Sequence, residues 1–242
     1  MKRKTVIRAA FFILLFLPAI AIAHFIVFPQ ETRCILLPLS NFNSSENLYY
    51  KDIDHGKIKA ILQVKSLAEK RNADFWKENL LLDYKIVYCN NEKVFNKYAP
   101  PFVPAATNMK MGAYIVIKDE SIDVDIISHE MSHTVLYRNI GWYKRTFKIP
   151  TWFDEGLAMQ VDERNYYSID SLLAKQQAGL TLPDVTKLKS AAEFFAGDHE
   201  TVMLHYATAK YIVHEWLKTH SLKKFIDDIN NGTGFEKAYG QQ

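Results

Sequence analysis

The sequence is poor in cysteine, which limits the kinds of metal site that it can form. Only two of its 242 residues are cysteines, Cys34 and Cys89, and neither has another cysteine at the spacing of thiolate metal ligands. The residues just before Cys34 also lack the small side chains of a lipoprotein processing site. In an oxidising compartment the two cysteines could form one disulfide. Because the sequence gives no distance between them, a disulfide and two unpaired thiols both stay open.

Beyond its first residues, the sequence also has almost no net charge. Its formal net charge is +3, and four cations precede the first apolar stretch: Lys2, Arg3, Lys4 and Arg8. Subtracting these four from +3 leaves −1 for the rest of the chain. Domains that bind nucleic acid typically carry a basic surface, so the sequence predicts no nucleic-acid partner.

Internal repeats and low-complexity runs are absent as well. Hydrophobic residues make up 48% of the chain and aromatic residues 13%, which is enough for a sizeable core and unlike the composition of a disordered protein. A length of 242 residues suits one globular domain with an additional N-terminal segment.

Residues 1–28 are typical of an export signal. The four cations lead into an apolar run from Ala9 to Phe28. Within it, Ala21-Ile22-Ala23 fits the small-x-small pattern of a cleaved signal peptide. The run continues past this site and is long enough to span a bilayer, which favours the alternative of an uncleaved anchor. Both alternatives predict a domain on the periplasmic or other extracytoplasmic side, with the membrane as a partner if the segment stays uncleaved.

The rest of the chain predicts one α+β domain. Residues 29–53 contain many turn-forming residues and are expected to form an irregular linker, followed by a domain over residues 54–242. A helix is expected over about 54–82, strands at Tyr84–Tyr88 and Ala113–Ile117, and a short helix between them at Glu92–Tyr98. Further helices are expected at about Ser168–Gln177, Ala191–Phe195, Glu200–Thr219 and Leu222–Ile229. The small sheet therefore belongs to the first part of the domain, and the second part is mainly helical.

The pattern His129-Glu130-Met131-Ser132-His133 indicates a metal site. It lies in a predicted helix that ends near Gly141 and is apolar nearly all round, so the helix should be buried. Residues four apart share one helix face, so His129 and His133 can offer nitrogens to one ion. Burying these groups is costly unless something compensates their charge, and a divalent ion would do so.

Catalytic zinc needs a third protein ligand and an open position for water. Glu155 is the candidate ligand, 22 positions after His133 and early in another predicted helix. Gly156 and Ala158 beside it would allow another helix to pack closely. The remaining histidines outside the apolar run have no partner at ligand spacing and are expected to be structural or on the surface; these include His55, His199, His214 and His220.

His-Glu-Met-Ser-His followed by Pro-Thr-Trp-Phe-Asp-Glu-Gly-Leu-Ala resembles the gluzincins, the group that includes thermolysin and aminopeptidase N. It is similar in particular to small bacterial members of the peptidase MA superfamily, whose signature joins H-E-x-x-H to a P-x-W-x-x-E-G-x-A helix. The resemblance covers roughly Tyr114 to Tyr239. It implies a zincin-like fold, one Zn²⁺ ion held by His129, His133 and Glu155, and Glu130 as catalytic base.

The resemblance also implies a hydrogen-bond donor for the oxyanion on a helix after the glutamate ligand. Tyr206 matches the usual position best, with His205 as the lesser alternative and packing in an apolar face as the alternative role for Tyr206. Strand Ala113–Ile117 is expected either as the edge strand along which a peptide could lie or as a plain core strand.

The sequence departs from the family pattern in two places. Thermolysin-like enzymes carry an aspartate four residues after the glutamate ligand, where this chain has Met159. Asp154 or Asp125 could supply the carboxylate that orients a histidine. The exopeptidase motif G-x-M-E-N is also absent, which weakens an aminopeptidase assignment.

The sequence thus predicts a zinc metallopeptidase. Its partner would be a peptide or protein, hydrolysed by a zinc-bound water that Glu130 activates. The alternative from another class is a binding or envelope-assembly module that keeps the peptidase fold with little turnover.

Overall fold

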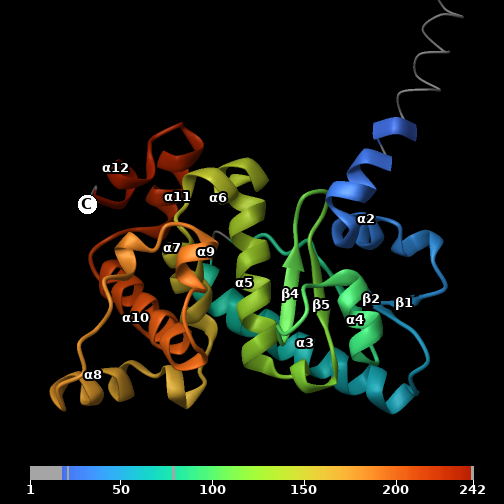
Figure 1. The fold of residues 1–242 in the computed structure, drawn as a ribbon, viewed down its shortest axis with the longest axis horizontal. Helices are drawn as coiled ribbons and strands as arrows, with labels where there is room; N and C mark the ends of the chain where they lie inside the picture. Colours follow the sequence, from blue (N-terminus) through green and yellow to red (C-terminus); the bar gives the residue numbers. More distant parts are fainter. Residues whose placement is uncertain (1–17, 21, 78–79, 241–242) are drawn as a thin grey trace, which may run out of the picture.

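The computed structural model describes residues 18–20, 22–77 and 80–240 (Figure 1). The export signal expected over residues 1–28 therefore lies largely outside the described residues. Within the described part of the chain, no helix is both long enough and apolar enough to cross a bilayer.

A five-stranded sheet forms the first part of the molecule, in the order β1-β2-β3-β5-β4. Strands β2, β3 and β5 run parallel to one another, whereas β1 and β4 are antiparallel strands at the two edges. The strands are β1 Asn43–Ser45, β2 Leu48–Tyr50, β3 Lys85–Tyr88, β4 Ala105–Asn108 and β5 Tyr114–Ile117.

Of the two alternatives for Ala113–Ile117, the edge strand is wrong and the core strand is confirmed. Strand β5 lies inside the sheet, because Ile115 pairs with Ile86 of β3 on one side and with Thr107 of β4 on the other. All four residues of β5 are buried, as expected for a strand covered on both faces. The edge strand on this side is β4, which the sequence did not predict; it follows closely on three prolines.

The prediction of an irregular linker over residues 29–53 is also wrong. This segment contains α2 Pro29–Ile35, the 3-10 helix η1 Leu37–Leu39 and the hairpin of β1 and β2. Its turn-forming residues mark the hairpin, where Glu46 and Asn47 have positive φ angles of 48° and 65°. Leu48 is fully buried and pairs with Ile86, so the segment belongs to the domain.

Helices cover both faces of the sheet. Side chains of alternate strand residues, such as Ile86 and Ile115, pack against α3 His55–Trp76 and α5 Val124–Ile140. Those of Val87 and Val116 face α2 and α4 Glu92–Tyr98. This alternation follows from the two-residue period of a strand.

Cys34 and Cys89 are buried together in the cluster between the sheet, α2 and α4. Both are free thiols in this structure, so of the two alternatives it contains the unpaired one. Asn108 donates a hydrogen bond to Cys34 Sγ at 3.3 Å. Burial raises the pKa of each thiol to about 12, which keeps both protonated at neutral pH.

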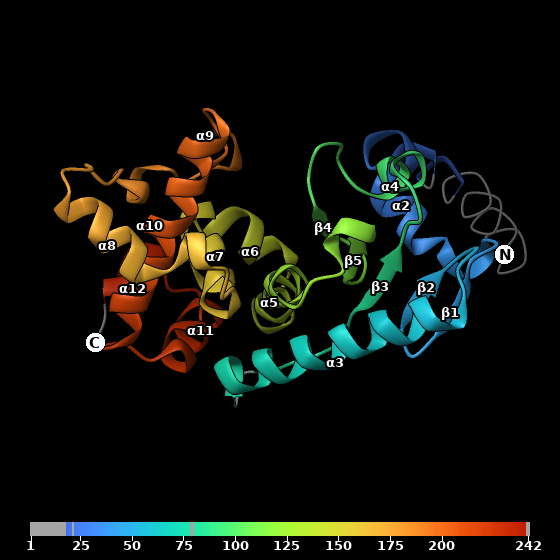
Figure 2. The same cartoon turned by 90° about the horizontal axis from the view of Figure 1, so that it is seen from below.

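Helix α3 joins the two parts of the molecule, and Figure 2 shows it running from the sheet to the helical part. Ile61 and Ala68 of α3 pack under the sheet, whereas Trp76 at its end belongs to the core of the second part. Buried polar contacts help to fix α3 to α5: Trp76 Nε1 donates to Ser132 Oγ and Asn72 Nδ2 donates to the Ser128 carbonyl, each at 3.1 Å.

The second part of the molecule is helical, as the sequence predicts. It contains α6 Trp142–Lys148, α7 Thr151–Ala158, η4 Met159–Val161, η5 Asn165–Tyr167, α8 Ile169–Gln177, η6 Val185–Lys187, α9 Ala191–Phe194, α10 His199–Leu217, α11 Leu222–Asn230 and α12 Phe235–Gly240. Helix α7 is central to it, because every residue of α7 except the first is buried. Phe153 of α7 contacts the rings of Trp216, Phe225 and Phe235.

Gly156 lets α7 and α10 approach each other closely, as the sequence predicts. A Cβ atom at this position would lie 2.6 Å from Val213 Cγ2 and 2.7 Å from the Ala209 carbonyl oxygen. Separations this short are repulsive, so the helices could not keep their spacing with any larger residue at position 156.

We therefore expect Gly156→Ala to lower the free energy of unfolding by about 1–3 kcal/mol. Thermal denaturation of the purified chain should show a melting temperature several degrees lower, at about 2–4 °C per kcal/mol. Gly234→Ala is the control, because no atom lies within 4 Å of its added Cβ. Equal melting temperatures for the two variants would contradict close packing at Gly156.

Candidate metal centre

Three atoms that could bind a metal, from two helices, lie within 3.4 Å of one another. His129 Nε2 and His133 Nε2, both from α5, are 3.2 Å apart. Oε2 of Glu155 in α7 lies 3.2 Å from the first nitrogen and 3.4 Å from the second. A tetrahedral zinc ion with bonds of about 2.0–2.1 Å has neighbouring ligands about 3.3–3.4 Å apart. The three atoms therefore match one face of such a tetrahedron.

These donors also fit a cation in their burial and charge. His129, His133 and Glu155 are only 7%, 6% and 8% exposed. Glu155 Oε2 is buried without a hydrogen-bond partner among the described residues, which is costly for a carboxylate that has no nearby positive charge. In the described part of the chain, no other group of three His, Cys, Asp or Glu side chains could share one ion.

The pKa values of His133 and Glu155 also fit a positive charge at this position. Burial alone would lower the pKa of His133, but the negative charges of Asp154 and Glu155 outweigh it and raise that pKa to about 10. Burial alone would raise the pKa of Glu155, but its coupling to His133 and His129 lowers that pKa well below its usual range. The surroundings thus favour a positive charge between these residues, and a metal ion can supply it in place of a proton.

Asp154 orients His133. The imidazole Nδ1 donates to Asp154 Oδ1 at 2.8 Å, which leaves Nε2 free to bind a metal. Arg145 Nη2 in turn lies 2.5 Å from Asp154 Oδ2. Of the two aspartates that the sequence offered for this role, Asp154 is the one that contacts a ligand. His129 lacks an equivalent, because its buried Nδ1 has no hydrogen-bond partner among the described residues.

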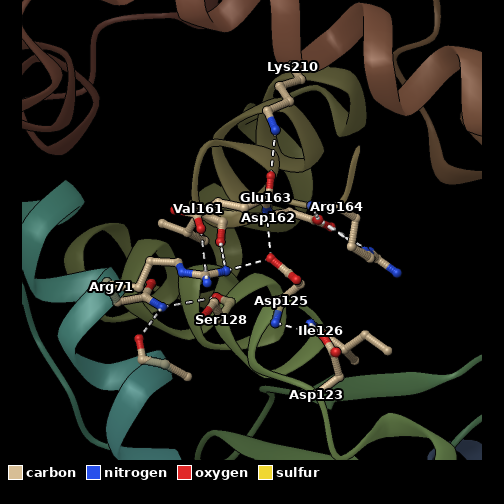
Figure 3. Close-up of polar contacts among 12 residues, drawn as sticks. Arg71, Asp123, Asp125, Ile126, Ser128, Val161, Asp162, Glu163, Arg164 and Lys210 are labelled. Carbon is tan, nitrogen blue, oxygen red and sulfur yellow. Dashed lines mark hydrogen bonds and ion pairs between the residues drawn. The ribbon is translucent and has the colours of Figure 1, made fainter. Parts of the chain in front are cut away.

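Asp125 serves a different part of the structure. Its carboxylate lies 2.5 Å from Arg71 Nη1 and accepts a hydrogen bond from the Glu163 backbone at 2.6 Å (Figure 3). It thereby ties the start of α5 to α3 and to the segment that follows α7. Its contribution is to the framework around the metal centre.

Glu130 lies next to His129 on α5 and faces the edge strand. The hydroxyl group of Thr107 in β4 donates to Glu130 Oε2. Thr107 is a site residue that the sequence analysis missed, since no motif marks it and β4 itself was not predicted. Its hydrogen bond ties the glutamate to the strand that borders the cavity.

Tyr206 lies on α10 beside the metal ligands, as the sequence predicts. Its ring contacts that of His129 with centroids 5.9 Å apart. Burial and then the charges of Glu155 and Glu130 raise the pKa of Tyr206 well above 10, so its hydroxyl stays protonated and can donate. The ring also packs on Phe194 and Tyr167, so the expected packing role and the position at the site are both present.

His205, the alternative to Tyr206, points elsewhere. It is buried, and its Nδ1 lies 2.7 Å from the Phe194 carbonyl oxygen. His199, expected to be structural or on the surface, is exposed but borders the cavity from the first turn of α10.

The three candidate ligands open onto a cavity of about 820 Å³. Its walls come from β4, α5, α10 and the segment after α7; besides the ligands they include Ala106, Thr107, Arg164, Tyr166, Tyr167 and Tyr206. A cavity of this volume lies in the usual range for ligand-binding sites, so a substrate could reach the ligands and Glu130 together.

Comparisons with protein-family models, with curated proteins and with solved structures gave no match to this chain.

Substitution of Asp154 tests its role in orienting His133. We expect Asp154→Asn to weaken zinc binding by about 10- to 100-fold, because the amide no longer fixes the imidazole as an anionic partner does. Competition with a fluorescent chelator measures this affinity. Asp125→Asn is the matched control and should leave zinc affinity unchanged. Equal losses of affinity in both variants would indicate general destabilisation and not a specific role of Asp154.

Proposed function

We propose that this protein is a zinc-dependent peptidase of the gluzincin type, with a zincin-like arrangement of its sheet and helices. The observation that carries the proposal is the convergence of His129, His133 and Glu155 at 3.2–3.4 Å with Glu130 beside them in an open cavity. The apolar start of the chain supports an extracytoplasmic location for this activity.

Zinc is the ion that this donor set suits best. Two imidazole nitrogens and one carboxylate oxygen are borderline ligands, whereas calcium and magnesium prefer sites made of oxygen alone. Three protein ligands leave one position open, as in catalytic zinc sites. When bound, zinc supplies a Lewis acid that lowers the pKa of a coordinated water from about 15.7 to about 7.

Glu130 supplies the base. Its carboxylate accepts the proton of the attacking water and later returns a proton to the departing amine nitrogen. The hydrogen bond from Thr107 restricts the rotation of this carboxylate and ties it to β4. The catalytic base and a peptide bound along β4 would therefore be positioned by the same strand.

Tyr206 supplies a hydrogen-bond donor. Because its raised pKa keeps the phenol protonated, the hydroxyl group can donate to the oxygen of the peptide carbonyl as negative charge develops there. The rings of Phe194 and Tyr167 hold the phenol in place, so its packing contacts also serve its catalytic position.

Strand β4 offers a place for the substrate backbone. It pairs with β5 on one side only, and Ala105, Ala106 and Thr107 border the cavity. An extended peptide can add to such an edge through main-chain hydrogen bonds. Ala113–Ile117 was one candidate for this role, which we assign instead to the neighbouring strand β4.

Replacing Glu130 by glutamine tests the proposed activity. We expect the full-length chain, loaded with zinc, to cleave members of a diverse peptide mixture, and Glu130→Gln to lower kcat by about 10²- to 10⁴-fold. Zinc content should be the same in both proteins, which elemental analysis checks. A wild-type chain that binds zinc but cleaves no better than Glu130→Gln would favour the binding or assembly module instead.

Tyr206→Phe tests the oxyanion donor. Removing one such donor should lower kcat by about 10²- to 10³-fold with little change in KM, since the interaction forms in the transition state. Tyr84→Phe is the control, because it removes a hydroxyl group that bonds to Glu69, and neither residue borders the cavity. Unchanged turnover in Tyr206→Phe would leave this tyrosine with packing alone.

A further inference from the structure

One basic side chain in the cavity wall has no part in the proposed hydrolysis. Arg164 lies in the segment that follows α7 and borders the cavity. Its Nε donates to the two carboxylate oxygens of Asp162 at 3.0 and 3.1 Å, and its Nη2 donates to one of them. Its Nη1 forms no hydrogen bond with any described residue. The guanidinium group therefore has donors left for a ligand.

The guanidinium group is held in one orientation. It lies over the rings of Tyr166 and Tyr167, 5.5 and 5.0 Å from their centroids. Asp162 is fully buried, so its carboxylate cannot turn toward solvent and keeps its contact with the guanidinium group. The ring of Tyr167 also contacts that of Tyr206 at 5.7 Å, which places Arg164 one side chain away from the proposed oxyanion donor.

The backbone that carries Arg164 is fixed from three helices (Figure 3). Lys210 of α10 donates to the Asp162 carbonyl oxygen. Arg71 of α3 donates to the Val161 carbonyl oxygen at 3.0 Å. Asp125, at the start of α5, accepts from the Glu163 backbone. A donor held in this way loses little conformational entropy when a ligand binds.

Arg145 also borders the cavity, but it belongs to the metal centre. It pairs with Asp154, the partner of His133. The contacts of Arg164 instead run to Asp162 and to the two tyrosines. Arg164 can therefore recognise part of a substrate without disturbing the orientation of a metal ligand.

We infer that Arg164 binds a carboxylate group of the substrate, so that the protein selects acidic peptides or free peptide C-termini. Asp162 occupies the edge of the guanidinium formed by Nε and Nη2, which leaves the edge formed by Nη1 and Nη2 for a second planar, bidentate acceptor. The inference rests on the proposed peptidase function, because it names the substrate class of that cavity.

Binding of a peptide library tests this without requiring turnover. The zinc-loaded full chain carrying Glu130→Gln is incubated with random hexapeptides in two forms, one with a free C-terminus and one amidated. Retained peptides are identified by mass spectrometry. Enrichment of Asp and Glu over Asn and Gln in both forms would assign the carboxylate to a side chain. Preference for the free-acid form would assign it to the C-terminus.

We expect a preference of about 10- to 100-fold for the carboxylate, as for hydrogen bonds to charged groups. Arg164→Lys should reduce this preference, since lysine keeps the charge but not the planar fork. Asp162→Asn combined with Arg164→Gln should abolish it while leaving no buried charge unpaired. Zinc content should be unchanged in these variants. If the preference is lost while zinc is retained, the carboxylate did not bind to the metal.

Arg138→Gln is the matched control, because Arg138 pairs with Asp83, lies outside the polar network that holds Arg164, and does not border the cavity. It should keep the preference. Absence of a carboxylate preference, or its survival in the double variant, would overturn the inference. Cleavage of both peptide forms by the chain with Glu130 intact reports separately on the peptidase function, so either idea can fail while the other stands.

Discussion

The burial of Glu155 against His129 and His133 is the constraint on which the rest of the structure depends. A buried carboxylate with an unpartnered oxygen needs a positive charge nearby. The two imidazoles and the separation of the donors provide a place for one. Helix α7 must therefore keep one position along α5, because a shift by a single residue would move Glu155 away from the histidines.

The packing of α7 maintains that crossing. Gly156 brings α7 against α10, and Phe153, three residues earlier, packs in an aromatic cluster. Asp154, between these two residues, reaches His133. Four consecutive residues thus divide between core packing, orientation of His133, the candidate metal site and close helix contact. This explains why a short stretch of sequence holds so much of the information about the site.

The cavity results from joining the sheet to the helical part. Edge strand β4 contributes Thr107 to Glu130, and α10 contributes Tyr206 from the other side. The segment after α7 adds Arg164, which three helices hold in place through its neighbours. A proposed catalytic base, an oxyanion donor and a substrate anchor therefore come from different elements around one buried ligand group.

The sequence by itself determined the mixed fold class, the helical second part, and the pairing of the H-E-x-x-H helix with Glu155 and Gly156. These features depend on local spacing, which one turn of helix converts directly into a shared face. Tertiary structure alone decided that β4 is the edge strand, that residues 29–53 form a helix and a hairpin, and that Asp154 rather than Asp125 orients His133. It also decided that Thr107 and Arg164 border the cavity. Strand order and contacts between distant segments arise from pairing and packing across the whole chain, so no local pattern encodes them.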